Sequence, residues 1–157
     1  MDDYAEAMDY LQEFDEKLGE EGLELEGVLI GQAALWEYAE RYDEEMEGRE
    51  TDDIDIYVPD VMQAFDIAEL YDEVPQQTGT RLEVDKDPEM YMDLIWDHPM
   101  AEEFVEAMES EEAEMVEGLE NIDLYLLPED VYIESKRNAG REKDDEDIAK
   151  LEQMMAL

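Results

Sequence analysis

The sequence contains no cysteine, a single histidine and no long apolar run. The absence of cysteine excludes disulfides, thiolate zinc sites and thiol catalysis. No apolar stretch approaches the roughly 20 residues that a membrane-spanning helix needs. The N-terminus begins Met-Asp-Asp-Tyr and lacks the basic flank and apolar core of a signal peptide. These absences predict a cytoplasmic protein with no membrane attachment.

Basic residues are also scarce, because the 157 residues include 51 acidic side chains and only 10 Lys and Arg, for a net charge of −41. One interpretation is a cytoplasm with molar salt, where repulsion among carboxylates is screened and a charged surface keeps the protein in solution. The alternative is a polyanion mimic that binds a basic partner. The acidic residues are spread from end to end, which favours adaptation to salt.

The pattern of apolar and turn residues predicts one domain, residues 1–157, in which helices and strands alternate. Helices are expected at 2–18, 32–42, 61–74, 100–118, 128–138 and 144–155, and strands at 23–31, 53–58, 81–84, 90–96 and 122–127. This order is typical of an α/β or α+β fold in which helices flank a small mixed sheet.

An acidic pair, Asp53 and Asp55, opens one of these expected strands. Spacing alone carries little information in so acidic a chain. In a strand, however, the two carboxylates share one face while Ile54 and Ile56 point to the other. A divalent cation would relieve their repulsion and take both as oxygen ligands. The alternative is a solvated strand edge.

A basic cluster stands out near the C-terminus, where four of the ten basic residues fall within eight positions: Lys136, Arg137, Arg141 and Lys143. Guanidinium and ammonium groups both bind phosphate well. The alternative is that they balance a helix dipole and pair with nearby aspartates.

A strand, a glycine and a helix follow one another in the stretch LIGQAAL, residues 29–35. Backbone N–H groups at such a helix start can hold a phosphate, although many strand-to-helix junctions look alike. Together, an acidic pair, a basic cluster and this turn suit chemistry on a nucleoside triphosphate.

These motifs, in this order, resemble the nucleotidyltransferase superfamily of the polymerase-β-like fold. They are most similar to the small stand-alone members that include abortive-infection toxins. The family pattern Arg-x-Thr-x-Asp-Ile-Asp is matched by Arg49, Thr51, Asp53, Ile54 and Asp55. The resemblance covers roughly residues 25–60 and 120–157. The C-terminal positions that match the family pattern are Lys136, Gly140, Arg141, Lys143, Asp144, Asp147, Ile148 and Leu151.

The resemblance implies a metal-dependent transfer of a nucleoside monophosphate from an NTP to a hydroxyl on RNA or protein. Asp53, Asp55 and a third carboxylate would be the catalytic residues and would hold Mg²⁺ or Mn²⁺. Asp93 is the candidate for that third carboxylate and Asp123 the runner-up. The residues implied in binding the NTP are Gly31, Gln32, Arg49, Thr51, Lys136, Arg141 and Lys143. The family also suggests a toxin that is paired with an antitoxin protein.

The chain departs from the family pattern at Gln32, where the family has a second small residue after the glycine. This substitution leaves open a catalytically degraded module that acts as a nucleotide sensor or a protein-binding partner. His98 is expected at the surface. Trp36 and Trp96 are expected in the core, with a wall of a base pocket as the alternative. No basic stripe offers itself to nucleic acid, so an RNA acceptor would have to bind residues 136–143.

Overall fold

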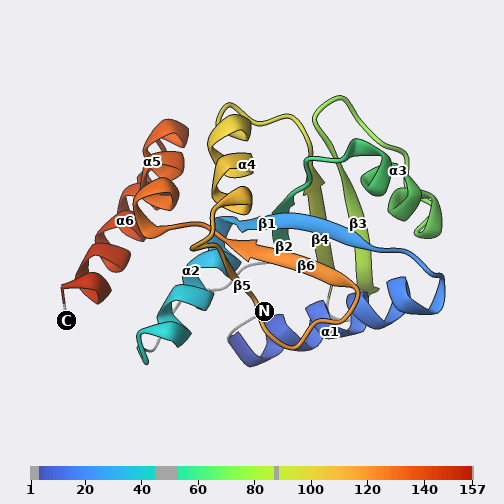
Figure 1. The fold of residues 1–157 in the computed structure, drawn as a ribbon, viewed down its shortest axis with the longest axis horizontal. Helices are drawn as coiled ribbons and strands as arrows, with labels where there is room; N and C mark the ends of the chain where they lie inside the picture. Colours follow the sequence, from blue (N-terminus) through green and yellow to red (C-terminus); the bar gives the residue numbers. More distant parts are fainter. Residues whose placement is uncertain (1–3, 45–52, 87–88, 157) are drawn as a thin grey trace.

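A six-stranded mixed sheet with helices around it forms the framework of the protein (Figure 1). The structure is a computed structural model that describes residues 4–44, 53–86 and 89–156. The helices are α1 (Tyr4–Glu20), α2 (Gly31–Arg41), α3 (Val61–Leu70), α4 (Ala101–Glu109), α5 (Glu129–Ala139) and α6 (Glu142–Met155). The strands are β1 (Leu25–Ile30), β2 (Asp53–Tyr57), β3 (Gly79–Lys86), β4 (Glu89–Ile95), β5 (Glu114–Met115) and β6 (Ile122–Leu126). The predicted α+β class with a mixed sheet is confirmed.

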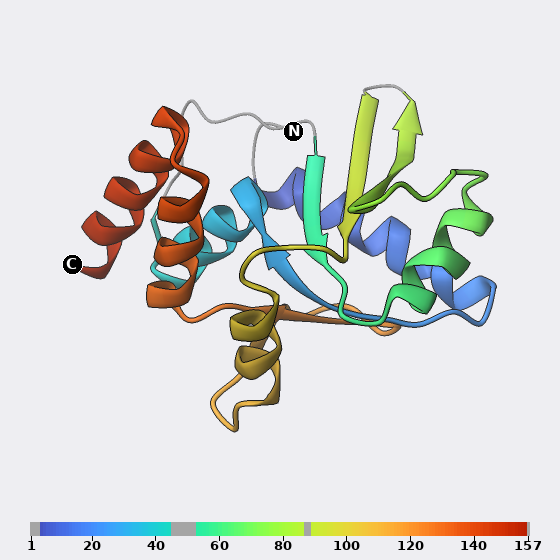
Figure 2. The ribbon, with the colours of Figure 1, turned by 90° about the horizontal axis from the view of Figure 1, so that it is seen from above.

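The strands lie in the order β3-β4-β2-β1-β6-β5. Strand β2 pairs parallel with β4 and antiparallel with β1, and β1 pairs parallel with β6. Helices α1 and α4 lie on opposite sides of the strands in both views (Figures 1 and 2). Apolar side chains from the central strands are fully buried, among them Val28, Ile54, Ile56, Leu94 and Leu124. None of the described helices is long and apolar enough to cross a membrane.

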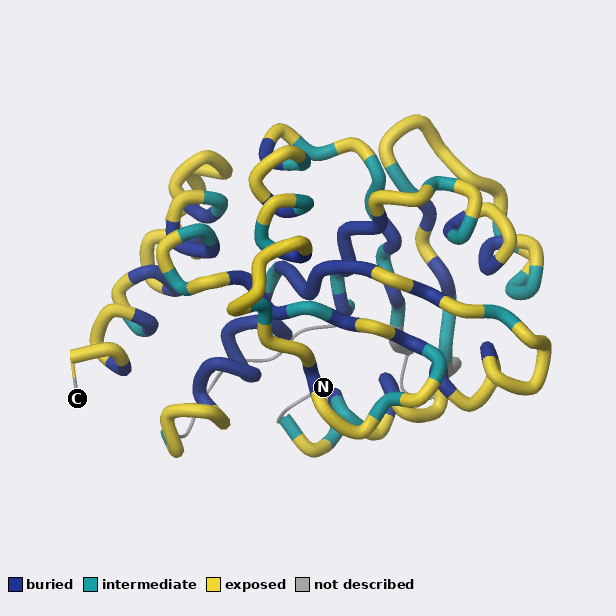
Figure 3. Tube along the Cα trace, in the orientation of Figure 1, coloured by how far each residue is buried: buried dark blue, intermediate teal, exposed yellow. Residues whose placement is uncertain are grey.

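Helix α2 is buried along most of its length, as Figure 3 shows, and every residue from 32 to 39 is enclosed. It follows β1 directly, with Gly31 as its first residue. The Tyr38 hydroxyl donates a hydrogen bond to the carbonyl of Leu127, and the Tyr38 ring packs edge-on against Tyr132 at 5.2 Å between centroids. Helix α2 therefore links the end of β6 and helix α5 to the central strands.

The helix expected at 100–118 is wrong beyond Glu109, where α4 ends. Ser110 is extended, and its hydroxyl accepts a hydrogen bond from the N–H of Glu112, which turns the chain. The chain then forms β5 against β6 and buries Val116. Residues 111–117 include good helix formers, but tertiary packing outweighs that weak preference.

Strand β3 is longer than the expected 81–84, because it pairs with β4 from Gly79 to Lys86. Helix α3 is shorter than expected and ends at Leu70, just before Asp72 takes a positive φ of 56°. Pairing with β4 sets the length of β3, and the turn at Asp72 follows the end of α3. Neither feature produces a periodic pattern in the sequence. The other expected elements agree with the structure to within two residues at each end.

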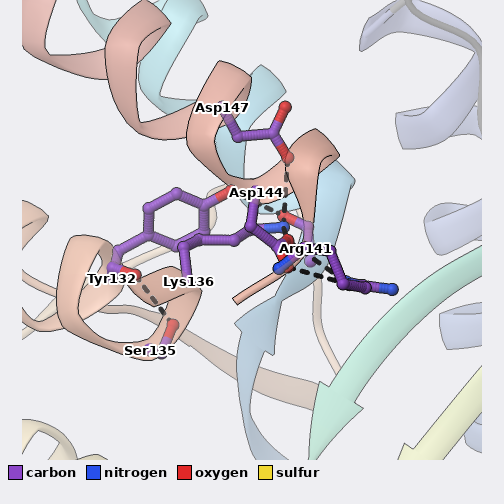
Figure 4. Close-up of polar contacts among 7 residues, drawn as sticks. Tyr132, Ser135, Lys136, Arg141, Asp144 and Asp147 are labelled. Atoms are coloured by element: carbon purple, nitrogen blue, oxygen red, sulfur yellow. Dashed lines mark hydrogen bonds and ion pairs between the residues drawn. The ribbon is translucent and has the colours of Figure 1, made fainter. Parts of the chain in front are cut away.

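Helices α5 and α6 lie side by side at one end of the molecule, with α3 at the opposite end (Figures 1 and 2). A buried ion cluster joins the pair (Figure 4). The Nζ atom of Lys136 lies 3.3 Å from Oδ1 of Asp144 and 3.1 Å from Oδ2 of Asp147, and both aspartate side chains are completely buried. Because a buried carboxylate needs a counter-charge, Lys136 is required for this packing.

We therefore expect Lys136→Met to lower the free energy of unfolding by about 3–5 kcal/mol, since it leaves the buried Asp147 without the ammonium beside it. The matched control is Arg137→Met on the same helix, because Arg137 makes a 3.5 Å ion pair with Glu152 in which both side chains are largely exposed. That change should cost less than about 1 kcal/mol. Urea denaturation at constant salt measures both, and equal losses would contradict a special role for Lys136.

Candidate metal centre

Strand β2 presents Asp53 and Asp55 on one face and buries its isoleucines on the other. Ile54 and Ile56 are fully buried, whereas both aspartates are only partly enclosed. This alternation is the two-residue period of a strand. The expectation that the two carboxylates share a face is confirmed.

Strand β4 adds a third carboxylate beside this pair. It runs parallel to β2, and Asp93 is the Cα partner of Asp55. One oxygen from each of Asp53, Asp55 and Asp93 lies within 4.8 Å of the others, a group that could hold a metal ion. The runner-up, Asp123, is exposed on β6 opposite Glu26 and is not part of this group. We call Asp53, Asp55 and Asp93 the aspartate cluster.

The turn between β1 and α2 lies against the aspartate cluster. Ile30, the last residue of β1, is the Cα partner of Asp55. Gly31 follows with a positive φ of 73°, and a Cβ atom there would lie 2.6 Å from Oδ2 of Asp55. The Tyr132 hydroxyl donates a hydrogen bond of 3.0 Å to the Gly31 carbonyl and so ties helix α5 to the same turn. Both the backbone conformation and the space at this position require glycine.

Arg81 of β3 binds the aspartate cluster from the opposite side. Its Nε and Nη2 donate to the two oxygens of Asp93 at 2.8 and 2.9 Å, and Nη2 lies 3.6 Å from Oδ2 of Asp53. These hydrogen bonds raise the pKa of Arg81. A metal ion on the cluster would compete with this guanidinium for the oxygens of Asp93. Sequence reasoning missed Arg81, although a rare basic residue one strand before Asp93 was a usable signal.

Within the aspartate cluster, Asp55 is a carboxylate whose pKa is raised. Burial raises its pKa to about 8, helped by the negative charges of Asp53 and Asp93 and a hydrogen bond with Asp93. The positive charge of Lys136 opposes this increase. At neutral pH the metal-free cluster therefore keeps a proton on Asp55, and a dication would favour its release.

The C-terminal cations fall into two groups. Lys136 is buried and engaged with Asp144 and Asp147, although its charge still reaches Asp55. Arg141 is largely exposed, and its pKa is raised by its hydrogen bond to Asp144 and, more weakly, by the charge of Asp55. Lys143 is exposed on the first turn of α6. Of the predicted basic cluster, Lys136 and Arg141 thus interact electrostatically with Asp55, and Lys136 is enclosed.

Three residues of the expected nucleotide site remain. Gln32 is 5% exposed, and within the described part of the chain neither atom of its amide has a hydrogen-bond partner. Arg49 and Thr51 lie outside the described residues.

The single histidine and the two tryptophans are not members of the aspartate cluster. Nδ1 of His98 accepts a hydrogen bond from the N–H of Met100 at the start of α4, and burial lowers its pKa. Trp36 is in the core, as expected. Trp96 is only partly buried and packs edge-on against Phe65.

Comparison with known proteins adds no assignment to this geometry: no family model matches the chain, and no curated protein matches it significantly.

We expect Asp55→Asn to stabilise the metal-free protein, and increasingly so as the pH rises from about 4 to 8. Over that range the folded wild type holds a proton that the unfolded chain has lost, so its stability falls with pH, and the amide removes this dependence. The gain at pH 8 should be roughly 2–4 kcal/mol, because partial exposure of the carboxylate reduces the penalty. Urea denaturation in EDTA across this range measures it.

Asp123→Asn is the control for this experiment, because it also removes one carboxylate but at an exposed position. It should give a small difference that does not change with pH. A pH-independent difference for Asp55→Asn as well would contradict the raised pKa.

Proposed function

We propose that the protein is a metal-dependent nucleotidyltransferase that moves a nucleoside monophosphate from an NTP to an acceptor hydroxyl. The observation that carries this proposal is the aspartate cluster, formed by adjoining strands beside a strand-glycine-helix turn. The sequence resemblance supports it, since that family pairs these same motifs.

The aspartate cluster suits Mg²⁺ or Mn²⁺. Carboxylate oxygens are the ligands that these hard cations prefer, and Asp53, Asp55 and Asp93 supply them at one place. The raised pKa of Asp55 reflects burial and, after it, repulsion from Asp53 and Asp93 that a dication would relieve. When bound, the ions would offset charge on the triphosphate and activate the acceptor hydroxyl.

In the proposed reaction the acceptor oxygen bonds to the α-phosphorus, and the bond from that phosphorus to the bridging oxygen breaks. Pyrophosphate leaves with the bonding electrons, and the hydroxyl proton passes to a carboxylate of the cluster, Asp93 by resemblance. Arg141, which is exposed and within range of the charge of Asp55, would bind charge that gathers on the leaving phosphates.

The biological setting of the proposal follows from resemblance and composition. The acceptor is an RNA or protein hydroxyl, and the enzyme is the toxin of a toxin–antitoxin pair whose partner is an antitoxin protein. The net charge of −41 favours a high-salt cytoplasm, because screening there removes most of the repulsion between surface carboxylates.

The second candidate is a non-catalytic module on the same fold that senses nucleotides or binds a protein. Two observations favour it. Gln32 occupies a position where the family has a small residue, and Arg81 already binds both oxygens of Asp93. Such a module would bind NTP without transferring any part of it.

The direct test is incubation with each α-labelled NTP, Mg²⁺ or Mn²⁺, and total RNA or protein from a halophile in molar KCl. We expect label to enter one acceptor class, with Asp53→Asn lowering the rate by at least about a hundredfold because a metal ligand is lost. Asp123→Asn, an exposed aspartate outside the cluster, should retain the wild-type rate. NTP binding without transfer would favour the sensor, and transfer that survives Asp53→Asn would refute the proposed site.

A second experiment tests the close approach of the turn to the metal ligands. Gly31→Ala should weaken Mn²⁺ binding by about ten- to a hundredfold, because the new Cβ forces Oδ2 of Asp55 to move. Gly22→Ala is the matched control, since Gly22 also has a positive φ, of 68°, but nothing lies within 4 Å of its Cβ position. Electron paramagnetic resonance of free Mn²⁺ in molar KCl measures both. Equal affinities would contradict the geometry.

A further inference from the structure

Arg141 is held by two of its three guanidinium nitrogens. Its Nε donates to Oδ2 of Asp144 at 2.8 Å, and Nη2 donates to Oδ1 at 3.1 Å. The remaining nitrogen, Nη1, hydrogen-bonds to no residue that the structure describes, and the side chain is 66% exposed. A guanidinium fixed along one edge in this way keeps its other edge available for an anion.

Asp144 is completely buried, and its own surroundings keep it ionised. Burial raises its pKa, but hydrogen bonds from Arg141 and the nearby charge of Lys136 outweigh that effect, so the pKa lies below the usual range. Asp144 also accepts the backbone N–H of Arg141 at 3.2 Å. This one carboxylate therefore binds the main chain and the side chain of Arg141 together with Nζ of Lys136.

The held guanidinium belongs to the helix pair that is tied to the turn beside the aspartate cluster. Figure 4 shows Asp144 between Lys136 and Arg141, with the tip of Arg141 pointing away from the two helices. The charge of Asp55 contributes to the raised pKa of Arg141. Tyr132, one helical turn before Lys136, fixes α5 to the Gly31 carbonyl beside Asp55. This hydrogen bond thus holds the α5–α6 pair at the turn beside the aspartate cluster.

We infer that Asp144 is a positioning residue that aims Arg141 at the triphosphate, and that Lys136 is a counter-ion of Asp144 and not a phosphate ligand. This inference rests on the proposed function, and it gives Arg141 and Lys136 of the basic cluster different roles. Lys136 has 7% of its side chain exposed and lies between two buried carboxylates, so phosphate could reach it only by breaking that packing. Arg141 presents its free edge without any rearrangement.

The test is calorimetric binding of inorganic tripolyphosphate with Mg²⁺ to the full chain in molar KCl. Arg141→Gln should weaken binding by about ten- to a hundredfold, as expected for charge-assisted hydrogen bonds. Asp144→Asn should weaken it to a similar degree, and the double variant should bind no more weakly than Arg141→Gln alone. A merely structural role for Asp144 would instead make the two losses add.

Two further variants keep the test decisive if Asp144→Asn does not fold. Arg141→Lys keeps the positive charge but lacks the two-pronged contact, so it should still weaken binding by about tenfold. Arg137→Gln removes the same charge from the neighbouring surface and should bind like the wild type.

The outcomes distinguish a failure of this inference from a failure of the proposed function. If the wild type binds tripolyphosphate and Arg141→Gln or Arg141→Lys binds equally well, this inference is overturned while the proposed function stands. Additive losses at Asp144 and Arg141 overturn the positioning role. If the wild type shows no binding at all, the nucleotidyltransferase proposal itself fails and the inference fails with it.

Discussion

The gathering of three partly buried carboxylates at one place in the sheet is the constraint on which the rest of the structure depends. Asp55 shows it most clearly, because burial and its two neighbours raise its pKa to about 8. Two of the chain's ten basic residues act on this cluster: Arg81 donates hydrogen bonds to Asp93, and the positive charge of Lys136 lowers the pKa of Asp55. A folded protein that concentrates charge in this way carries an unfavourable term that only a cation or a proton can offset.

Topology explains why the cluster forms where it does. Strand β2 lies between β1 and β4, so one strand supplies two aspartates and a parallel neighbour supplies the third in register. The antiparallel pairing with β1 then places the end of that strand, and Gly31 after it, against Asp55. A bulkier residue than glycine would separate the turn from the cluster. The same turn anchors α5 through Tyr132, which brings the C-terminal cations to this side of the molecule.

The sequence predicted the features that depend on the spacing of residues along one strand or helix. It did not predict those that depend on which strands pair or which side chains pack together. The strand period predicted that Asp53 and Asp55 share a face, and the family resemblance implied a third carboxylate for which Asp93 was the candidate. Arg81 was missed because its partner lies twelve positions away on a strand whose register the sequence does not show. The helix expected at 100–118 failed for a related reason, since β6 recruits residues 114–115 into the sheet. The burial of Lys136 was likewise invisible, because basic residues are usually exposed.

The contrast between enclosed and exposed ion pairs shows how electrostatics can operate in so acidic a protein. At molar salt, charges exposed to solvent are screened over about 3 Å, so a surface pair such as Arg137 with Glu152 contributes little. Lys136, Asp144 and Asp147 are shielded from that screening by burial. Arg141 is exposed but is fixed by a buried carboxylate, and it therefore keeps its orientation where a free surface arginine would not. The orientation of charged groups in this chain thus depends on the few ion pairs that burial holds in place, and not on the sum of its surface charge.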